Sequence, residues 1–279
     1  MNTLIDPRDL AVRLTDPAWV VLDCRHDLSD PAAGRAAYAR GHIPGARFAG
    51  VDAELCGLRT GRNGRHPLPE AAAAAAALGA LGVSASSRVV AYDAQGGMFA
   101  ARLWWMLRWL GHDAVAVLDG GWQRWLAEIR LTATDVPTLA AATFTPRPRP
   151  VNVDAAAVAA HVRHPGQVLV DARAPDRFRG ENEKLDPVGG HVPGAVNRYF
   201  MDNLADGRFK PAATLEAEWR AVLGSAAPAS VVHMCGSGVS ACHNLLALEV
   251  AGLGGGRLYP GSWSEWCADP ARPVATGRP

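Results

Sequence analysis

The sequence repeats itself, and this repeat limits the fold more than any other feature. Two patterns recur first: VVLDCR at 20–25 as VLVDAR at 168–173, and GHIPGARF at 41–48 as GHVPGAVN at 190–197. Two more follow: RVVAYD at 88–93 as SVVHMC at 230–235, and DGGWQRW at 119–125 as YPGSWSEW at 259–266. Matches in one order at similar intervals predict a duplicated domain of about 130 residues.

The boundary between the two copies is marked by proline. The segment TFTPRPRPVNVD at 143–154 alternates proline with arginine, so it cannot continue a helix or a central strand. We therefore predict an N-terminal domain over 1–142, a Pro/Arg connector over 143–153 and a C-terminal domain over 154–279.

Within each copy, short β-branched runs alternate with longer helical patterns. The stretch 69–82 begins with proline and is rich in alanine, and apolar residues recur at helical spacing from Met98 to Trp109. This alternation predicts an α/β fold in which each domain has a mainly parallel sheet flanked by helices. Ligands collect at the carboxyl ends of such strands, and Asp93 and Cys235 both follow a predicted strand.

Charge and cysteine content exclude several classes of function. The net charge is +1, from 28 basic and 27 acidic residues, which favours neither a nucleic-acid nor a membrane partner. No run reaches 18 apolar residues, so we expect no membrane span; the start MNTLIDPRDL has no basic stretch followed by an apolar one, so we expect no export signal. Five cysteines without a C-x-x-C pair, and nine histidines without a ligand motif, predict a reduced, cytoplasmic protein without a metal.

Cys235 stands between a predicted strand and a predicted helix, in the loop Cys235-Gly-Ser-Gly-Val-Ser240. Gly236 and Gly238 lack Cβ atoms, so the backbone can curl and direct its N–H groups toward the sulfur. These amides and the helix N-terminus favour negative charge, and they would hold a thiolate or a persulfide anion. We predict that Cys235 is a nucleophile. The remaining cysteines have no such setting and are expected to be packing or surface thiols: Cys24, Cys56, Cys242 and Cys267.

The first copy has Asp93 at the position of Cys235. A carboxylate cannot perform thiol chemistry, so we expect the N-terminal domain to be catalytically inactive.

The duplicated D-x-R and GH-x-PGA patterns and the strand-end cysteine loop resemble the rhodanese family of sulfurtransferases over essentially the whole chain. The resemblance implies two tandem rhodanese-like domains and transfer of a sulfane sulfur through a cysteine persulfide to a thiol or cyanide. No cofactor is implied, because the cysteine carries the sulfur. The loop is similar to the C-G-[ST]-G-V-T loop of mercaptopyruvate enzymes, with Ser240 in place of threonine.

The resemblance also implies substrate-binding residues. The arginine that binds the donor matches Arg177, and the loop positions Gly236, Gly238, Val239 and Ser240 would surround the donor. A second arginine of mercaptopyruvate enzymes lies nine residues further on, where this chain has Asp186; Arg179 is one candidate to replace it. The segment 181–190 is more similar to thiosulfate enzymes, so thiosulfate:cyanide sulfurtransfer is the alternative activity.

A proton relay is implied in the same way. Ser237 matches the relay serine, His66 in RHPLP the histidine, and Asp52 the aspartate. Serine would bridge substrate and histidine, histidine would move the proton, and aspartate would fix its tautomer. His42 and His191 lie in Pro/Gly turns, and we expect them to be structural.

A cysteine loop of this kind could also serve two other functions. Rhodanese-fold phosphatases close a related loop with an arginine six residues after the cysteine, but position 241 is alanine. A persulfide relay to a protein partner is the other alternative, and no segment of the sequence marks a surface for such a partner.

Overall fold

The computed structural model describes residues 1–138, 141–161 and 168–278. It divides into two compact units. The N-terminal unit contains residues 1–57 and 69–149, and the C-terminal unit contains residues 58–68 and 150–279. The segment 58–68 lies early in the chain but packs within the C-terminal unit. Among the described helices, none has the length and apolar character needed to span a bilayer.

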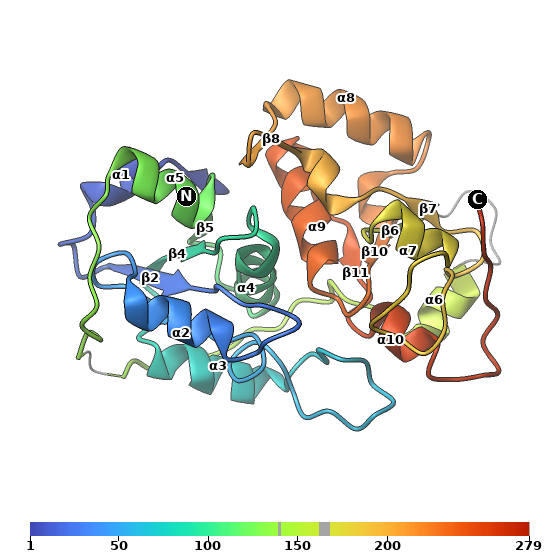
Figure 1. Ribbon diagram of the computed structural model, residues 1–279, viewed down its shortest axis with the longest axis horizontal. Helices are drawn as coiled ribbons and strands as arrows, with labels where there is room; N and C mark the ends of the chain where they lie inside the picture. The colour runs from blue at the N-terminus through green and yellow to red at the C-terminus, as the bar shows by residue number, and fades with distance from the viewer. Residues whose placement is uncertain (139–140, 162–167, 279) are drawn as a thin grey trace. The chain divides into compact units, whose positions relative to one another are not determined.

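The N-terminal unit is built on a five-stranded sheet in which every pair of neighbours is parallel, in the order β1-β5-β4-β2-β3. Figure 1 shows α1 and α5 on one side of these strands and α3 on the other. The strands are β1 (Leu4–Ile5), β2 (Trp19–Asp23), β3 (Arg47–Phe48), β4 (Arg88–Tyr92) and β5 (Val115–Leu118). The helices are α1 (Pro7–Ala11), α2 (Ala33–Arg40), α3 (Ala71–Ala80), α4 (Met98–Trp109) and α5 (Gly121–Glu128).

The C-terminal unit has a four-stranded parallel sheet, β11-β10-β6-β7, and a short antiparallel hairpin of β8 and β9. Its strands are β6 (Leu169–Asp171), β7 (Val196–Asn197), β8 (Leu204–Ala205), β9 (Arg208–Phe209), β10 (Val232–Met234) and β11 (Arg257–Leu258). Its helices are α6 (Ala155–His161), α7 (Pro175–Arg179), α8 (Ala212–Leu223), α9 (Ser240–Val250) and α10 (Ser262–Trp266), with 3₁₀ turns η1 (Phe200–Asn203) and η2 (Pro228–Ser230).

Two hydrophobic cores enclose this second sheet. Leu169 and Val232 pack on one face with residues of α6 and α10, such as Trp266. Val170 and Val231 pack on the other with residues of α8 and α9. Neighbouring residues of a strand point to opposite faces, so both faces are buried, which explains why these strands are continuous apolar runs. The predicted α/β class, with a parallel sheet flanked by helices in each domain, is confirmed.

The repeated D-x-R pattern forms the same buried ion pair in both units. Arg25 Nη2 lies 2.6 Å from Asp23 Oδ2 and donates to the carbonyl of Gly41 at 2.7 Å. Arg173 Nη2 likewise lies 2.7 Å from Asp171 Oδ2 and donates to the carbonyl of Gly190 at 2.7 Å. Each pair ties the end of a strand to the glycine that opens a GH-x-PGA turn.

The turn histidines are structural, as the sequence predicts. His42 Nδ1 lies 2.9 Å from the carbonyl of Tyr38, and the two rings stack with centroids 3.9 Å apart. His191 repeats this arrangement with Phe178, at 2.9 Å and 3.8 Å.

Candidate active site

Cys235 follows β10, at the carboxyl end of a strand in the middle of the parallel sheet, and α9 begins five residues later. Its side chain is almost fully buried, with 2% of the residue exposed. The N–H of Gly238 donates to its Sγ at 3.1 Å. The structure therefore has the strand–loop–helix arrangement that the glycine spacing predicts, with a backbone donor on the sulfur.

The loop carbonyls are held on the opposite side, by the start of α10. The N–H of Trp263 donates to the carbonyl of Cys235, and that of Ser264 to the carbonyl of Gly236, both at 2.9 Å. Ser262 Oγ accepts the N–H of Cys235 at 3.1 Å and donates to the carbonyl of Tyr259 at 2.9 Å. Because these carbonyls are occupied by α10, the loop can turn N–H groups toward the sulfur.

Gly238 has a left-handed backbone conformation, with φ +76°. A Cβ at this position would lie 2.4 Å from the carbonyl oxygen of Pro260. Glycine is therefore required here both by conformation and by space. Val239 occupies the N-cap position of α9 and is buried, and Ser240 is the first residue of that helix.

Ser237 and His66 meet in the C-terminal unit, because residues 58–68 pack there. Ser237 Oγ lies 2.7 Å from His66 Nδ1, and both residues are 5% exposed. The predicted pair is thus within hydrogen-bonding distance, in a place shielded from water. Asp52 belongs to the N-terminal unit, where its Oδ2 lies 3.8 Å from Nε2 of His26. Its part in a relay stays a prediction.

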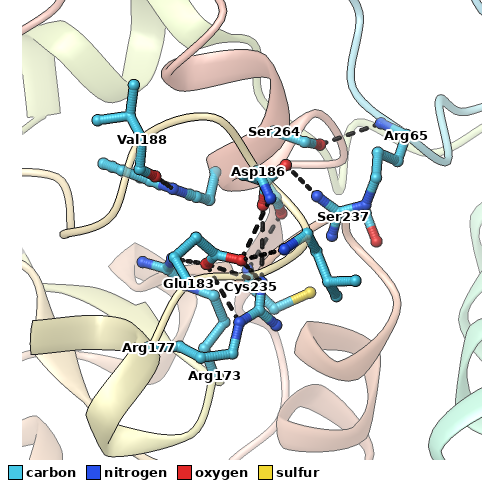
Figure 2. Close-up of polar contacts among 12 residues, drawn as sticks. Arg65, Arg173, Arg177, Glu183, Asp186, Val188, Cys235, Ser237 and Ser264 are labelled. Atoms are coloured by element: carbon cyan, nitrogen blue, oxygen red, sulfur yellow. Dashed lines mark hydrogen bonds and ion pairs between the residues drawn. The ribbon is translucent and has the colours of Figure 1, made fainter. Parts of the chain in front are cut away.

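Arg177 extends from α7 into a cluster of charged groups (Figure 2). Its Nε and Nη2 donate to Glu183 at 2.8–3.1 Å, and its Nη2 lies 3.6 Å from Asp186 Oδ2. Arg173 also lies near Glu183, with Nη1 3.4 Å from Oε2. Burial would raise the pKa of Glu183, but the hydrogen bond from Arg177 and the nearby cations hold it below its usual value.

The sequence prediction missed Arg65. Its Nη1 pairs with Asp186 Oδ1, and its backbone N–H donates to Ser264 Oγ at 3.0 Å (Figure 2). A Cβ built on Gly236 would lie 2.9 Å from Arg65 Nη2 and 3.6 Å from Arg177 Nη1. Two guanidinium groups therefore approach the cysteine loop at Gly236. Arg179, the candidate from sequence, instead pairs with Glu181 at 2.7–2.8 Å.

The other four cysteines are buried thiols, as expected. Burial raises the pKa of Cys24, where nearby carboxylates act in the same direction. Burial also raises the pKa of Cys267, to about 11. Such thiols are protonated at neutral pH and are poor nucleophiles. Taken separately, neither unit brings three His, Cys, Asp or Glu ligand atoms of its described residues together as a metal site would require.

In the N-terminal unit, the loop equivalent to the Cys235 loop surrounds the side chain of Asp93. Its Oδ1 accepts the N–H groups of Gln95 and Gly97, each at 2.8 Å. Its Oδ2 accepts those of Phe99 and Ala100, at 2.7 and 2.9 Å. Burial raises the pKa of Asp93, whereas these four N–H donors favour its carboxylate form, so the loop at the start of α4 holds a buried carboxyl group on backbone donors.

Known proteins resemble the chain over nearly its full length. The model of the rhodanese-like domain matches twice, over residues 6–128 and 154–269. A "Probable 3-mercaptopyruvate sulfurtransferase" of Pseudomonas aeruginosa is 48% identical over 278 residues, covering 98% of each chain. A thiosulfate sulfurtransferase of Mus musculus is 33% identical over 292 residues, covering 96% of this chain and 90% of the other.

A solved structure agrees with these matches. The crystal structure of SseA from Escherichia coli, described as a 3-mercaptopyruvate sulfotransferase, superimposes with a TM-score of 0.82 at 28% identity. The alignment covers 94% of this chain and 99% of SseA. The two ordered sets of motifs, the two parallel sheets and these matches agree: the chain belongs to the rhodanese family, with two rhodanese-like domains in tandem.

Proposed function

We propose that this sulfurtransferase takes a sulfane sulfur from 3-mercaptopyruvate and carries it as a persulfide on Cys235. The observation that carries the proposal is the Gly238 N–H, which donates to Cys235 Sγ at 3.1 Å. A donor fixed beside the sulfur stabilises a negative charge without reorganisation, both on an attacking thiolate and on a persulfide anion.

The first half-reaction forms one S–S bond and breaks one C–S bond. The Cys235 thiolate attacks the thiol sulfur of 3-mercaptopyruvate, and the electron pair of the C–S bond leaves on the enolate of pyruvate. The enolate then takes a proton and becomes pyruvate. Ser237 and His66, in contact at 2.7 Å, are the proposed source of this proton, and Asp52 is proposed to orient His66.

In the second half-reaction an acceptor attacks the outer sulfur and releases the Cys235 thiolate. Cyanide would leave as thiocyanate, and a small thiol or a protein thiol would leave as a persulfide. No cofactor enters these steps, because Cys235 holds the sulfur throughout. A persulfide relay to a dedicated protein acceptor, and the cytoplasmic location predicted from the sequence, stay predictions.

Arg177 and the loop positions Gly236, Gly238, Val239 and Ser240 are the proposed donor-binding residues. The charged groups around Arg177 support a monoanionic donor. Three arginines, Arg65, Arg173 and Arg177, are matched there by three carboxylates, Asp171, Glu183 and Asp186. In a cluster without excess positive charge, a buried dianion such as thiosulfate leaves more negative charge uncompensated than a monoanion does.

The test compares the two donors in initial-rate assays with one acceptor. We expect kcat/KM to be higher for 3-mercaptopyruvate than for thiosulfate. Thiosulfate is the second candidate because the segment with Asp186 resembles thiosulfate enzymes and the mouse relative carries that name. A kcat/KM for thiosulfate equal to or above that for 3-mercaptopyruvate would reverse the assignment. The Cys235→Ser variant should be inactive with both donors.

A further inference from the structure

We propose that Arg65 is a second donor-binding residue, which together with Arg177 holds the 2-oxo carboxylate end of the donor above the cysteine loop. This inference rests on the proposed function and identifies Arg65 as a residue that would select donors with a 2-oxo carboxylate. Arg65 lies in residues 58–68, far from the catalytic loop in sequence, but this segment packs within the C-terminal unit.

The position of Arg65 relative to the loop carries the argument. The Cβ direction of Gly236 points toward two guanidinium groups: Arg65 Nη2 at 2.9 Å, and Arg177 Nη2 and Nη1 at 3.5 and 3.6 Å. Gly236 adjoins Cys235, so both guanidinium groups approach the residue next to the nucleophile. Two planar forks from different segments are suited to a carboxylate and its neighbouring keto oxygen, which offer three acceptor atoms in one plane.

Arg65 is also held in place. Its Nη1 pairs with Asp186, whose side chain is 3% exposed, and its backbone N–H donates to Ser264 Oγ at 3.0 Å. Ser264 in turn donates its own N–H to the carbonyl of Gly236 at 2.9 Å. The side chain of Arg65 is 27% exposed and that of Arg177 is 21% exposed. Both cations therefore remain accessible to a small ligand while their partners are buried.

Asp186 has a defined part in this arrangement: it positions a cation. Its Oδ1 pairs with Arg65, and its Oδ2 lies 3.6 Å from Arg177 Nη2. One carboxylate thus bridges the two arginines. Asp186 also lowers the positive charge of the pair, which favours a donor with a single negative charge over a dianion.

The test uses the full chain, and pyruvate as a probe that cannot transfer sulfur. Direct titration should show that Arg65→Met weakens pyruvate binding by on the order of 10- to 100-fold, the loss expected for one charge-assisted hydrogen bond. The KM for 3-mercaptopyruvate should rise by a similar factor, with kcat within about threefold. Arg65→Lys should recover part of both. Arg62→Ala, an exposed arginine of the same segment, is the matched control and should change neither.

Two further variants separate donor binding from a purely structural role. Arg65→Met leaves the buried Asp186 without one of the two arginines that it contacts, so the double variant Arg65→Met/Asp186→Asn restores the charge balance. We expect it to fold with wild-type thermal stability and to retain the weak pyruvate binding. Asp186→Asn alone keeps the Arg65 charge and one acceptor oxygen for Arg65, so its KM for 3-mercaptopyruvate should rise by a much smaller factor than that of Arg65→Met. Equal increases in KM for Asp186→Asn and Arg65→Met would overturn the proposal, as would pyruvate binding in Arg65→Met within twofold of wild type.

The two proposals fail in different ways. Absence of a Cys235 persulfide in the wild-type protein would refute the proposed function, whatever the pyruvate titrations show. If the wild type forms the persulfide but Arg65→Met binds pyruvate normally, the proposed function stands and the assignment of Arg65 falls.

Discussion

Asp93→Asn tests most directly whether the strand-end loops stabilise a negative charge. Asp93 is fully buried, and its two carboxylate oxygens accept four backbone N–H groups at 2.7–2.9 Å. An asparagine keeps one acceptor oxygen for two of these donors. Its NH₂ group would face the other two N–H groups, so two buried donors would lose their hydrogen bonds.

The magnitude follows from these two lost bonds. A buried donor left without an acceptor costs about 1–3 kcal/mol, so Asp93→Asn should lower the free energy of unfolding by about 2–6 kcal/mol. This is a large part of the roughly 5–15 kcal/mol that stabilises a typical domain. The assay is urea denaturation followed by tryptophan fluorescence, analysed for the transition of the N-terminal unit.

Asp113→Asn is the matched control for this substitution. Asp113 lies in the same unit and pairs with Arg149 at 2.6 Å, but its side chain is 60% exposed. Loss of such a surface ion pair should change the stability by less than about 1 kcal/mol. If Asp93→Asn were no more destabilising than Asp113→Asn, the loop would not be an anion-binding loop, and the same reasoning for the Cys235 loop would lose its support.

Three other predictions concern the C-terminal unit. Ser237→Ala should lower kcat with 3-mercaptopyruvate by about 10²- to 10⁴-fold, because it removes the contact with His66. Turnover of thiosulfate, whose leaving group needs no proton, should fall less than tenfold, and equal losses with both donors would contradict a proton relay. Gly238→Ala should destabilise the loop by about 1–3 kcal/mol and abolish most activity, because its Cβ would lie 2.4 Å from the Pro260 oxygen. Gly252 has a similar φ of +72° but space for a Cβ, so the control variant Gly252→Ala should retain activity. Burial lowers the pKa of His233 to about 3, against about 6.5 in an unfolded chain, so the free energy of unfolding of the wild type should fall by up to about 1.4 kcal/mol per pH unit below pH 6.5 and stay constant above pH 7. His233→Leu should therefore reduce this pH dependence on the acid side, and an unchanged slope between pH 4 and 6 in urea titrations would refute the prediction.

Much of the fold could be predicted from the sequence because the repeat and the local patterns agree. The alanine-rich stretch forms α3 at Ala71–Ala80, the tryptophan-rich pattern forms α4 at Met98–Trp109, and α9 begins at Ser240 after the glycine loop. Apolar periodicity, proline and glycine decide these elements locally. The strand-end position of Cys235 follows from the same signals.

The rest of the site could not be predicted, because it depends on contacts between distant segments. Arg65 and Asp186 form an ion pair although they are 121 residues apart, and no local sequence pattern indicates that they contact each other. Ser262 was missed for a different reason: it has φ +53°, a conformation unusual for serine. The repeat held a signal for it, since Gly121 stands at the matching position of the first copy with φ +56°.

The central claim is that Cys235 carries the transferred sulfur. Intact-mass analysis after exposure to 3-mercaptopyruvate, followed by peptide mapping, tests it directly. The account predicts a gain of one sulfur atom on Cys235, release of an equal amount of pyruvate, and loss of that sulfur on addition of cyanide; Cys235→Ser should gain none. Release of pyruvate without sulfur on Cys235, or sulfur found on Cys24, Cys242 or Cys267 instead, would contradict the account.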